Sequence, residues 1–195
     1  MSDPGPQLWL VRHGATEWSE NGRHTSYTDL PLLPEGEAAA RSLAPRLADH
    51  GFALVLTSPR QRARDTARLA GFPDAVVDDD LREWDYGELE GLTTAQIRQR
   101  TPGWTIWSGA PEDGETIEEV AARVDGVIRR IRSQLGPHDV AALVAHGHVL
   151  RVLAARWVGA PPDAGRWLAL DTGSISELGW ERDTAVVRHW NVTAE

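Results

Sequence analysis

The chain alternates short apolar runs with longer segments in which apolar residues recur every three or four positions. The short runs occur at 8–11, 53–58, 75–77 and 140–145. Runs of this length are typical of strands that are buried on both faces of a sheet. We therefore predict strands at these places, followed by final strands within 167–191 that are joined by a turn at 181–183.

Helical patterns occupy the segments between these runs, at 34–51, 60–71, 93–100, 116–135 and 148–159. The clearest of them begins at Thr116, because its apolar residues recur at steps of three or four up to Leu135. Thr116 and Glu119 form a capping-box pattern at its start, and Gly136 precedes Pro137 at its end. In the first helix, Pro45 is expected to kink or shorten the segment that Gly51 ends.

Strands that alternate with helices predict a single α/β domain over 1–195, with a mostly parallel sheet covered on both faces. One long connection, 101–114, contains turn residues throughout and two tryptophans, Trp104 and Trp107. Connections of this length are usually functional or mobile. It is either a surface loop anchored by its tryptophans or a lid over a substrate.

Charge and composition exclude several classes of protein. The net charge of -9 and the isoelectric point near 5.2 argue against a nucleic-acid partner. The chain has no cysteine, which excludes disulfides and thiolate nucleophiles. Its N-terminal residues are polar and rich in turn formers, unlike a secretory signal, and no apolar run approaches the roughly 20 residues of a membrane helix. We expect a soluble, cytoplasmic protein without a membrane partner.

Ionisable side chains follow four of the predicted strands, at the point where each strand ends. They are Arg12, His13 and Gly14; Ser58, Pro59, Arg60 and Arg62; Arg82 and Glu83; and His146, Gly147 and His148. The carboxyl ends of parallel strands meet at one edge of a sheet, where ligands of such folds bind. Two imidazoles, several guanidiniums and a carboxylate at one edge are the groups expected for phosphoryl transfer through a covalent phosphohistidine.

His13 is the candidate nucleophile. An imidazole can accept a phosphoryl group on one nitrogen when a backbone acceptor holds the other as N–H, and Gly14 allows a tight turn beside it. Arg12 and Arg62 are candidates for binding the phosphoryl oxygens, which match the planar donors of arginine. Arg62 lies in the first helical turn after its strand, whereas Arg60, Arg64 and Arg68 are one turn apart and suggest a solvated stripe.

Glu83 is the candidate for proton transfer. The leaving alkoxide needs a proton and the attacking water must lose one, so a single carboxyl group can serve both steps. His146 is expected to stabilise the transferring charge as a cation or hydrogen-bond donor.

Six segments then carry a resemblance that spans nearly the whole chain. They are LVRHGATEW, GRHTSYTDLPL, TSPRQRARDTA, REWDYGELEGL, GET and VAHGHVLR, in this order. The sequence resembles the histidine phosphatase superfamily, also called phosphoglycerate mutase-like. The resemblance implies a three-layer α/β/α sandwich, a phosphohistidine intermediate without a metal or other cofactor, and the same five central residues, Arg12, His13, Arg62, Glu83 and His146.

The resemblance also implies that Ser19, the turn around Thr25 and the amide of Gly147 hold phosphate or substrate. Ser19 stands where the family commonly has asparagine, and Ser26 where it has glycine after the threonine, so both are candidate contacts with altered chemistry. The family frequently has a threonine that caps the helix beginning near residue 34. This sequence has Leu33 at that position.

The segments around 22–32 and 83–92 most resemble small acid and sugar-phosphate phosphatases, which act on small phosphate esters. Trp84 follows the acid where mutase members usually have arginine, and it is expected to shape specificity together with Trp104 and Trp107. No further cations are evident for a second anionic group. The alternatives are a cofactor-dependent phosphoglycerate mutase and a non-catalytic phosphate-binding protein.

A metal-dependent hydrolase built on 78–80 with His146 and His148 is a further alternative, although consecutive strand residues point to opposite faces. A homodimer could form through an edge strand near Trp180 or Trp190.

Overall fold

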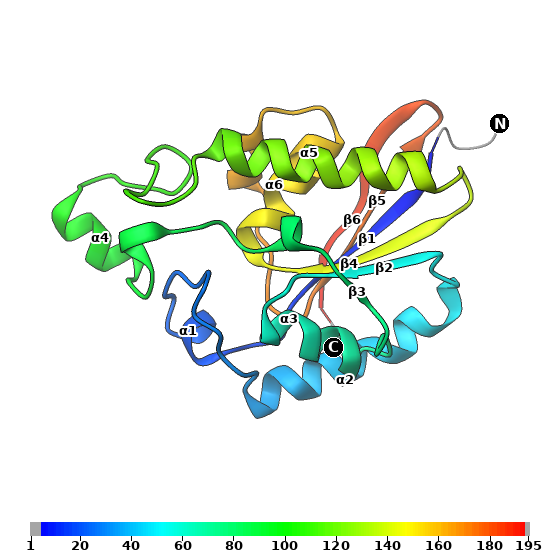
Figure 1. Cartoon of the computed structure of the whole chain (residues 1–195), viewed down its shortest axis with the longest axis horizontal. Coiled ribbons are helices and arrows are strands. Elements are labelled where there is room, and N and C mark those ends of the chain that lie inside the picture. Colours follow the sequence, from blue (N-terminus) through cyan, green and yellow to red (C-terminus); the bar gives the residue numbers. More distant parts are fainter. Residues whose placement is uncertain (1–4, 194–195) are drawn as a thin grey trace.

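The computed structural model describes residues 5–193, and a single six-stranded sheet runs through its centre (Figure 1). The strand order is β3-β2-β4-β1-β5-β6. Strands β1 to β4 pair in parallel, β5 pairs antiparallel with β1, and β6 pairs antiparallel with β5. The strands are β1 (Gln7–Arg12), β2 (Leu54–Thr57), β3 (Val76–Val77), β4 (Val140–Ala145), β5 (Ile175–Glu181) and β6 (Thr184–Val192). The predicted α/β sandwich with a mostly parallel sheet is confirmed.

Alternate side chains of β1 divide the core into two layers. Leu8 and Leu10 pack in the larger apolar cluster, whereas Trp9 and Val11 pack in the smaller one on the opposite face. All four are buried, as a central strand covered on both faces requires. The uninterrupted apolar run that predicted this strand therefore supplies two separate cores.

Helices cover each face of the sheet (Figure 1). Helices α2 (Pro34–Leu47) and α3 (Gln61–Leu69) lie on one face, and α5 (Ile117–Gln134) and α6 (Gly147–Trp157) lie on the other. Two shorter helices, α1 (Glu17–Glu20) and α4 (Thr94–Arg100), lie beyond one end of the sheet. Short 3-10 turns are η1 (Ala48–His50), η2 (Asp79–Leu81), η3 (Gly87–Leu89) and η4 (Pro162–Trp167).

Local sequence rules account for most helix boundaries. The capping box of Thr116 and Glu119 forms at the start of α5 as predicted. Helix α2 begins at Pro34 without a side-chain cap from Leu33, continues through Pro45 for two residues and ends before the short turn that Gly51 closes in a left-handed conformation. Pro45 thus lies close to the helix end, as the prediction of a shortened segment implied.

The long connection 101–114 is anchored by its aromatic residues. Trp104 and Ile106 are buried in the larger core, and Trp107 packs against it. The indole of Trp104 donates a hydrogen bond to the carbonyl of Gly109 at 3.2 Å. These contacts are the ones that the anchored-loop alternative predicts.

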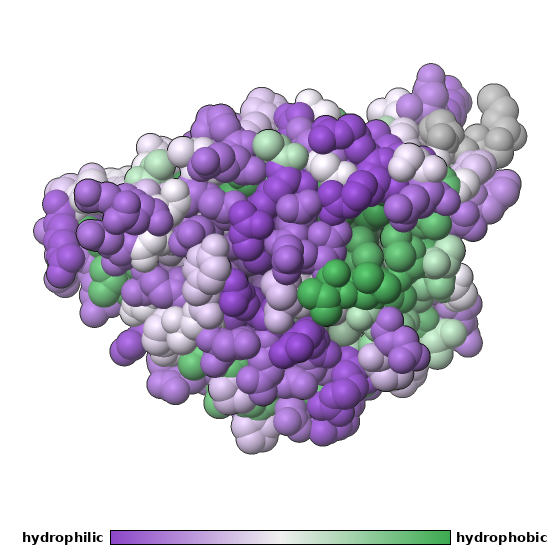
Figure 2. All heavy atoms as spheres, in the orientation of Figure 1, coloured by the Kyte–Doolittle hydropathy of each residue, from purple (hydrophilic) through white to green (hydrophobic). Residues whose placement is uncertain are grey.

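The sequence predicted an edge strand near Trp180 or Trp190 that could pair with a second copy of the chain, and only one of these residues lies on an edge strand. Trp180 is buried on β5, which is not an edge strand, while Trp190 lies on the edge strand β6. The exposed valines of the sheet are instead Val76 and Val77 on the other edge strand, β3, where Figure 2 shows an apolar area. Trp180 is therefore excluded as an edge contact because strands cover both its sides. Within 5–193, no helix has the length and apolar character required to cross a membrane.

Candidate active site

Strand register brings the predicted residues together. Arg12 at the end of β1 is the direct partner of Ala145 at the end of β4, so the residues that follow both strands leave the sheet side by side. Thr57 on β2 pairs with Val144, which places Ser58 next to them. The rings of His13 and His146 consequently lie 5.1 Å apart between centroids. The sheet edge that the sequence indicated is the place where the candidate groups meet.

His13 is held in one tautomer by its own backbone. Its Nδ1 lies 2.7 Å from the carbonyl oxygen of Gly14, and the ring is buried with 5% of its surface exposed. Burial, reinforced by the charges of Arg62 and Arg12, lowers the pKa of His13 well below its usual 6.5. A neutral ring whose Nδ1 donates to a carbonyl must have an unprotonated Nε2. That nitrogen is available as a nucleophile.

Gly14 is required at its position by a close backbone contact. A side chain at Gly14 would collide with the backbone of Gly36 in α2, and a side chain at Gly36 would collide with Ala15. The amide of Gly14 donates to Thr66 Oγ1 in α3 at 3.0 Å. The carbonyl that orients His13 is thus fixed by the packing of two helices.

Two arginines lie beside His13 with buried donors that have no partner. Arg62 on α3 is 1% exposed, and its terminal nitrogens donate to the carbonyls of the loop that contains Thr25, Ser26 and Thr28, at 3.1 to 3.2 Å. Arg12 donates from Nη1 to the carbonyl of Leu170. The Nε atoms of both guanidiniums are buried without a hydrogen bond. Buried unpaired donors on cations mark a place where an anion would satisfy them.

His146 contributes a further unpaired donor. Its Nε2 lies 2.6 Å from Ser58 Oγ, and that oxygen already accepts the amide of Arg60. The Ser58 hydroxyl can donate to Nε2, and in that arrangement the hydrogen of the neutral ring is on Nδ1, an atom that is buried without a partner. Burial and the nearby charge of Arg62 lower the pKa of His146 well below 6.5. Of the two predicted forms of His146, the lowered pKa favours the neutral one over the cation.

Glu83 is bound by backbone amides at the start of α6. Its Oε1 accepts from the amides of Trp84 and Val149 at 2.9 Å, and its Oε2 accepts from the amide of His148 at 3.0 Å. The side chain is 5% exposed and lines the cavity described below. These three bonds fix the position of both carboxyl oxygens at the cavity wall.

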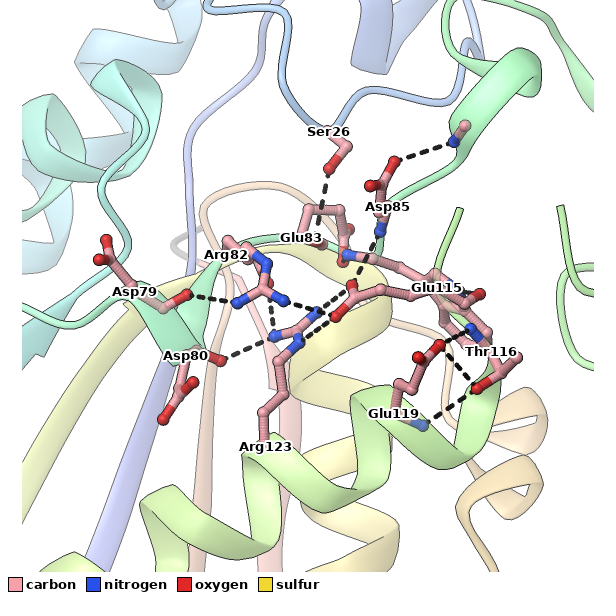
Figure 3. A network of polar contacts seen from close by, with 12 residues as sticks. Ser26, Asp79, Asp80, Arg82, Glu83, Asp85, Glu115, Thr116, Glu119 and Arg123 are labelled. Atoms are coloured by element: carbon pink, nitrogen blue, oxygen red, sulfur yellow. Dashed lines mark hydrogen bonds and ion pairs between the residues drawn. The ribbon is translucent and has the colours of Figure 1, made fainter. Parts of the chain in front are cut away.

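A buried ion network holds the segment on either side of Glu83 (Figure 3). Glu115 accepts from Arg82 at 2.8 Å, from two nitrogens of Arg123 at 2.9 Å and from the amide of Asp85 at 3.0 Å. Arg123 on α5 also donates to the carbonyls of Asp80 and Arg82 at 2.7 and 2.8 Å. Glu115 and Arg123 therefore position the backbone around Glu83. The sequence analysis assigned no role to this pair, because nothing local to either residue indicates the contact.

The cavity at this edge has a volume of about 260 Å³. Its lining residues are Arg12, His13, Thr16, Ser19, Gly22, Arg23, His24, Thr25, Glu83, Tyr86, Thr94, Gly147, His148, Arg151 and Leu170. Six of the ten predicted site residues are on this wall. Arg62 and His146 lie buried beside it, and the two others are Ser26 and Trp84.

Ser26 and Trp84 do not have the substrate contacts predicted for them. Ser26 is 1% exposed, its amide donates to both oxygens of Glu90 at 2.9 Å, and its hydroxyl lies 3.4 Å from the carbonyl of Glu83. Trp84 is fully buried, and its indole donates to the carbonyl of Glu115 at 2.8 Å. Glu83 thus faces the cavity, whereas the neighbouring Trp84 packs in the core.

Ser19 and Thr25 lie on the wall through local contacts. Ser19 exchanges hydrogen bonds with Thr16 at the start of α1, including a bond of 2.9 Å to the amide of Thr16. Thr25 Oγ1 donates to the carbonyl of Arg23 at 3.1 Å, and the carbonyl of Thr25 binds Arg62. Gly147 begins α6 beside Arg12, and its amide has no hydrogen-bond partner within the described part of the chain. It is a free donor at a helix N-terminus.

The cavity wall also contains Tyr86, His148 and His24, to which the sequence assigned no role in phosphoryl transfer. The hydroxyl of Tyr86 lies 2.6 Å from His148 Nδ1. Burial raises the pKa of Tyr86 well above 10 and lowers that of His148 well below 6.5, so this hydrogen bond joins two neutral groups. Burial also lowers the pKa of His24 to about 4. The only indication in the sequence that these residues belong to the site was that His24 lies in the segment GRHTSYTDLPL and His148 in VAHGHVLR.

The acidic run 78–80 has a structural use. Arg130 on α5 donates to Asp78 at 2.7 Å and to Asp80 at 2.9 Å. Across residues 5–193, no three side chains of the types that bind metals come together. Arg60, which was expected in a solvated stripe, instead has its guanidinium 4.5 Å from the ring centre of Tyr27, whereas Arg64 and Arg68 are exposed as predicted.

Replacing Arg123 by methionine should lower the free energy of unfolding by about 3 kcal/mol, because the change leaves part of the charge of buried Glu115 uncompensated. Arg130→Met is the matched control on the same helix. Its ion pairs are half exposed and worth less than about 1 kcal/mol. Urea unfolding of both variants checks this, and equal losses would contradict the positioning role of the network.

Stability should fall as the pH drops below 6.5. The pKa of His24 is near 6.5 in the unfolded chain and about 4 in the folded one, so the unfolded state binds more protons between these values. Between pH 7 and pH 5 this one group should cost about 2 kcal/mol. Unfolding of wild type and His24→Gln at both pH values measures the contribution, and identical losses in the two proteins would refute it.

Several known proteins are similar to this chain in sequence and in fold. A family model described as histidine phosphatase superfamily (branch 1) matches residues 8–193. An acid phosphatase of Mycobacterium tuberculosis is 39% identical over 90% of this chain and 87% of its own length. A sedoheptulose 1,7-bisphosphatase of Saccharomyces cerevisiae is 36% identical over 79% of this chain and 68% of its own length. A probable phosphoglycerate mutase of Enterobacter is 31% identical over 95% and 90%.

The fold gives the same result. The solved structure of an open reading frame product from Mycobacterium tuberculosis superposes with a TM-score of 0.92 and 36% identity, covering 96% of this chain and 98% of that one. A match over nearly all of the described residues, together with relatives above 30% identity, shows the family. The chain belongs to the histidine phosphatase superfamily.

Proposed function

We propose that this phosphatase hydrolyses small phosphate monoesters by transferring the phosphoryl group to Nε2 of His13 and then to water. The observation that carries the proposal is the bond between His13 Nδ1 and the carbonyl of Gly14, in a buried place beside two guanidiniums. It leaves one unprotonated ring nitrogen at the cavity wall. Named relatives that are phosphatases support the reaction class.

In the first step, the lone pair of His13 Nε2 attacks phosphorus and the bond from phosphorus to the ester oxygen breaks. The leaving alkoxide takes a proton from Glu83, which enters this step as the acid. In the second step, Glu83 as carboxylate removes a proton from water, the water oxygen bonds to phosphorus and the bond to Nε2 breaks. Free phosphate leaves, and both side chains return to their starting states.

The charge on the transferring group is stabilised by donors that have no other partner. Nε of Arg12, Nε of Arg62 and Nδ1 of His146 are buried and unsatisfied, and the amide of Gly147 lies at the N-terminus of α6. Preorganised donors of this kind typically contribute about 100- to 1000-fold each to the rate. The anion binding that the sequence predicted for the four residues thus has a specific donor atom in each case.

The size of the cavity favours a metabolite over a macromolecule. A volume of about 260 Å³ is slightly smaller than typical ligand pockets, which begin at about 300 Å³. It suits a phosphate ester with a few carbons, including a small sugar phosphate. A cytoplasmic location and a possible homodimer are parts of this proposal that rest on the sequence alone.

Phosphoglycerate mutase activity is a second candidate, since one relative is named a probable phosphoglycerate mutase. Both reactions begin with the same phosphohistidine and differ in the acceptor. Incubation with a phosphoglycerate distinguishes them, because hydrolysis releases inorganic phosphate and a mutase interconverts the isomers.

His13→Ala should abolish hydrolysis of a generic aryl phosphate, with kcat reduced by at least about 1000-fold, because the change removes the nucleophile that lies beside the two guanidiniums. Thr94→Ala, which also changes the wall, serves as a control that keeps most of the activity. Initial rates of phosphate release measure both. Equal turnover by His13→Ala and wild type would exclude the covalent mechanism.

Glu83→Gln should slow poor leaving groups far more than good ones. An alkyl alkoxide needs a proton in order to leave, whereas a nitrophenolate hardly does, so we expect about 100- to 10,000-fold loss in kcat with alkyl esters and a smaller loss with aryl esters. Single-turnover rates with both ester types isolate the first step. A loss that is the same for both would remove Glu83 from the role of acid.

A further inference from the structure

The cavity contains a cation that binding of one phosphate does not use. Arg151 on α6 lines it together with Arg12 and Arg23, and Glu83 is the one carboxylate on the same wall. The chain as a whole carries a net charge of -9, so this excess of positive charge is local. The sequence showed no evident cation for a second anionic group, and the structure corrects this because it places Arg151 on the cavity wall.

Arg151 is fixed in place and still has free donors. Its Nε donates to the carbonyl of Gly165 at 3.0 Å, and its Nη2 donates to the carbonyl of Arg166 at 3.1 Å. Its guanidinium lies 4.7 Å from the ring centre of Trp107, which comes from the loop 101–114. Nη1 makes no hydrogen bond to any of the described residues. A rotamer held in advance loses little entropy when that nitrogen binds an anion.

The helix sets the distance between the two anion sites. Gly147, His148 and Arg151 all line the cavity, and positions three and four residues apart lie on one face of a helix. Four residues advance about 6 Å along the axis, and helical side chains lean towards the N-terminus. Arg151 therefore follows Gly147 by about one helical turn on the same face of α6, and both line the cavity.

We propose that the preferred substrates carry a second anionic group, a carboxylate or a second phosphate, which binds Nη1 of Arg151 about one helical turn from the reacting phosphorus. This inference rests on the proposed phosphatase function and specifies its substrate class. In the cavity of about 260 Å³, the two groups are separated by a chain of a few carbons. Arg151 is then a specificity-determining residue, and the reaction at His13 does not depend on it.

The test compares matched three-carbon phosphate esters that end in a carboxylate, a second phosphate or a neutral amide, with nitrophenyl phosphate as a substrate that lacks any second group. Wild type should hydrolyse the carboxylate or the bisphosphate with a kcat/KM about 10- to 100-fold above that of the amide, the gain expected from one charge-assisted hydrogen bond. The arm that shows this preference identifies the second group. Equal kcat/KM for all three esters would overturn the proposal, while turnover of nitrophenyl phosphate would still support the phosphatase function.

Variants locate the effect. Arg151→Gln should raise KM for the preferred ester by about 10- to 100-fold while leaving nitrophenyl phosphate turnover within about 3-fold, and Arg151→Lys should restore part of the preference. Arg166→Gln is the matched control, since Arg166 pairs with Asp163 at the surface. A preference that survives in Arg151→Gln, or that disappears equally in Arg166→Gln, would show that Arg151 does not bind the second group. Because the comparison of esters in wild type needs no variant, it decides the matter even if Arg151→Gln does not fold.

Discussion

The chemistry of this site depends on one hydrogen bond, between Nδ1 of His13 and the carbonyl of Gly14. In water an imidazole exchanges between two tautomers and a cation, and only one of these forms offers an unprotonated Nε2. Burial beside two guanidiniums removes the cation, and the carbonyl selects the tautomer. The backbone contact between Gly14 and Gly36 keeps that carbonyl in place, so the state of the nucleophile is determined by how α2 packs at the end of β1.

A buried guanidinium that is to bind phosphate needs hydrogen-bond acceptors that do not cancel its positive charge. Arg62 solves this with carbonyl oxygens from the loop around Thr25, whose dipoles satisfy its terminal nitrogens while its full charge stays available. A carboxylate partner would have competed with the phosphate. The loop itself is tied down by Glu90, which accepts the amides of Ser26 and Thr28. An ion pair is found outside the cavity wall instead, between Glu115 and Arg123, and it positions the segment that contains Glu83.

The sequence predicted the fold, and the sheet edge where the candidate site residues meet, for a definite reason. Strand β1 contains an uninterrupted apolar run, ends at Arg12 and is followed by His13. The apolar run predicted the strand, and the residues at its end indicated the candidate chemistry. Arg62 was separated from its neighbours by helical periodicity, and the structure buries it as that argument requires. Trp84 was misplaced because its burial depends on residues distant in sequence, Glu115 and Trp107, that local patterns do not reveal. Arg151 and Glu115 were missed because their contacts, to Gly165 and Arg123, are set by tertiary packing.

The central claim is that Nε2 of His13, and no other atom, carries the phosphoryl group between the two steps. Its most direct test is to quench a single turnover under alkaline conditions, locate the label by peptide mass spectrometry and assign the nitrogen by phosphorus NMR. The account predicts a stoichiometric phosphoryl group on Nε2 of His13 in wild type, accumulating further when Glu83→Gln slows its hydrolysis. A label on Nδ1 or on another residue, or product formed in a single turnover with no labelled intermediate, would contradict it.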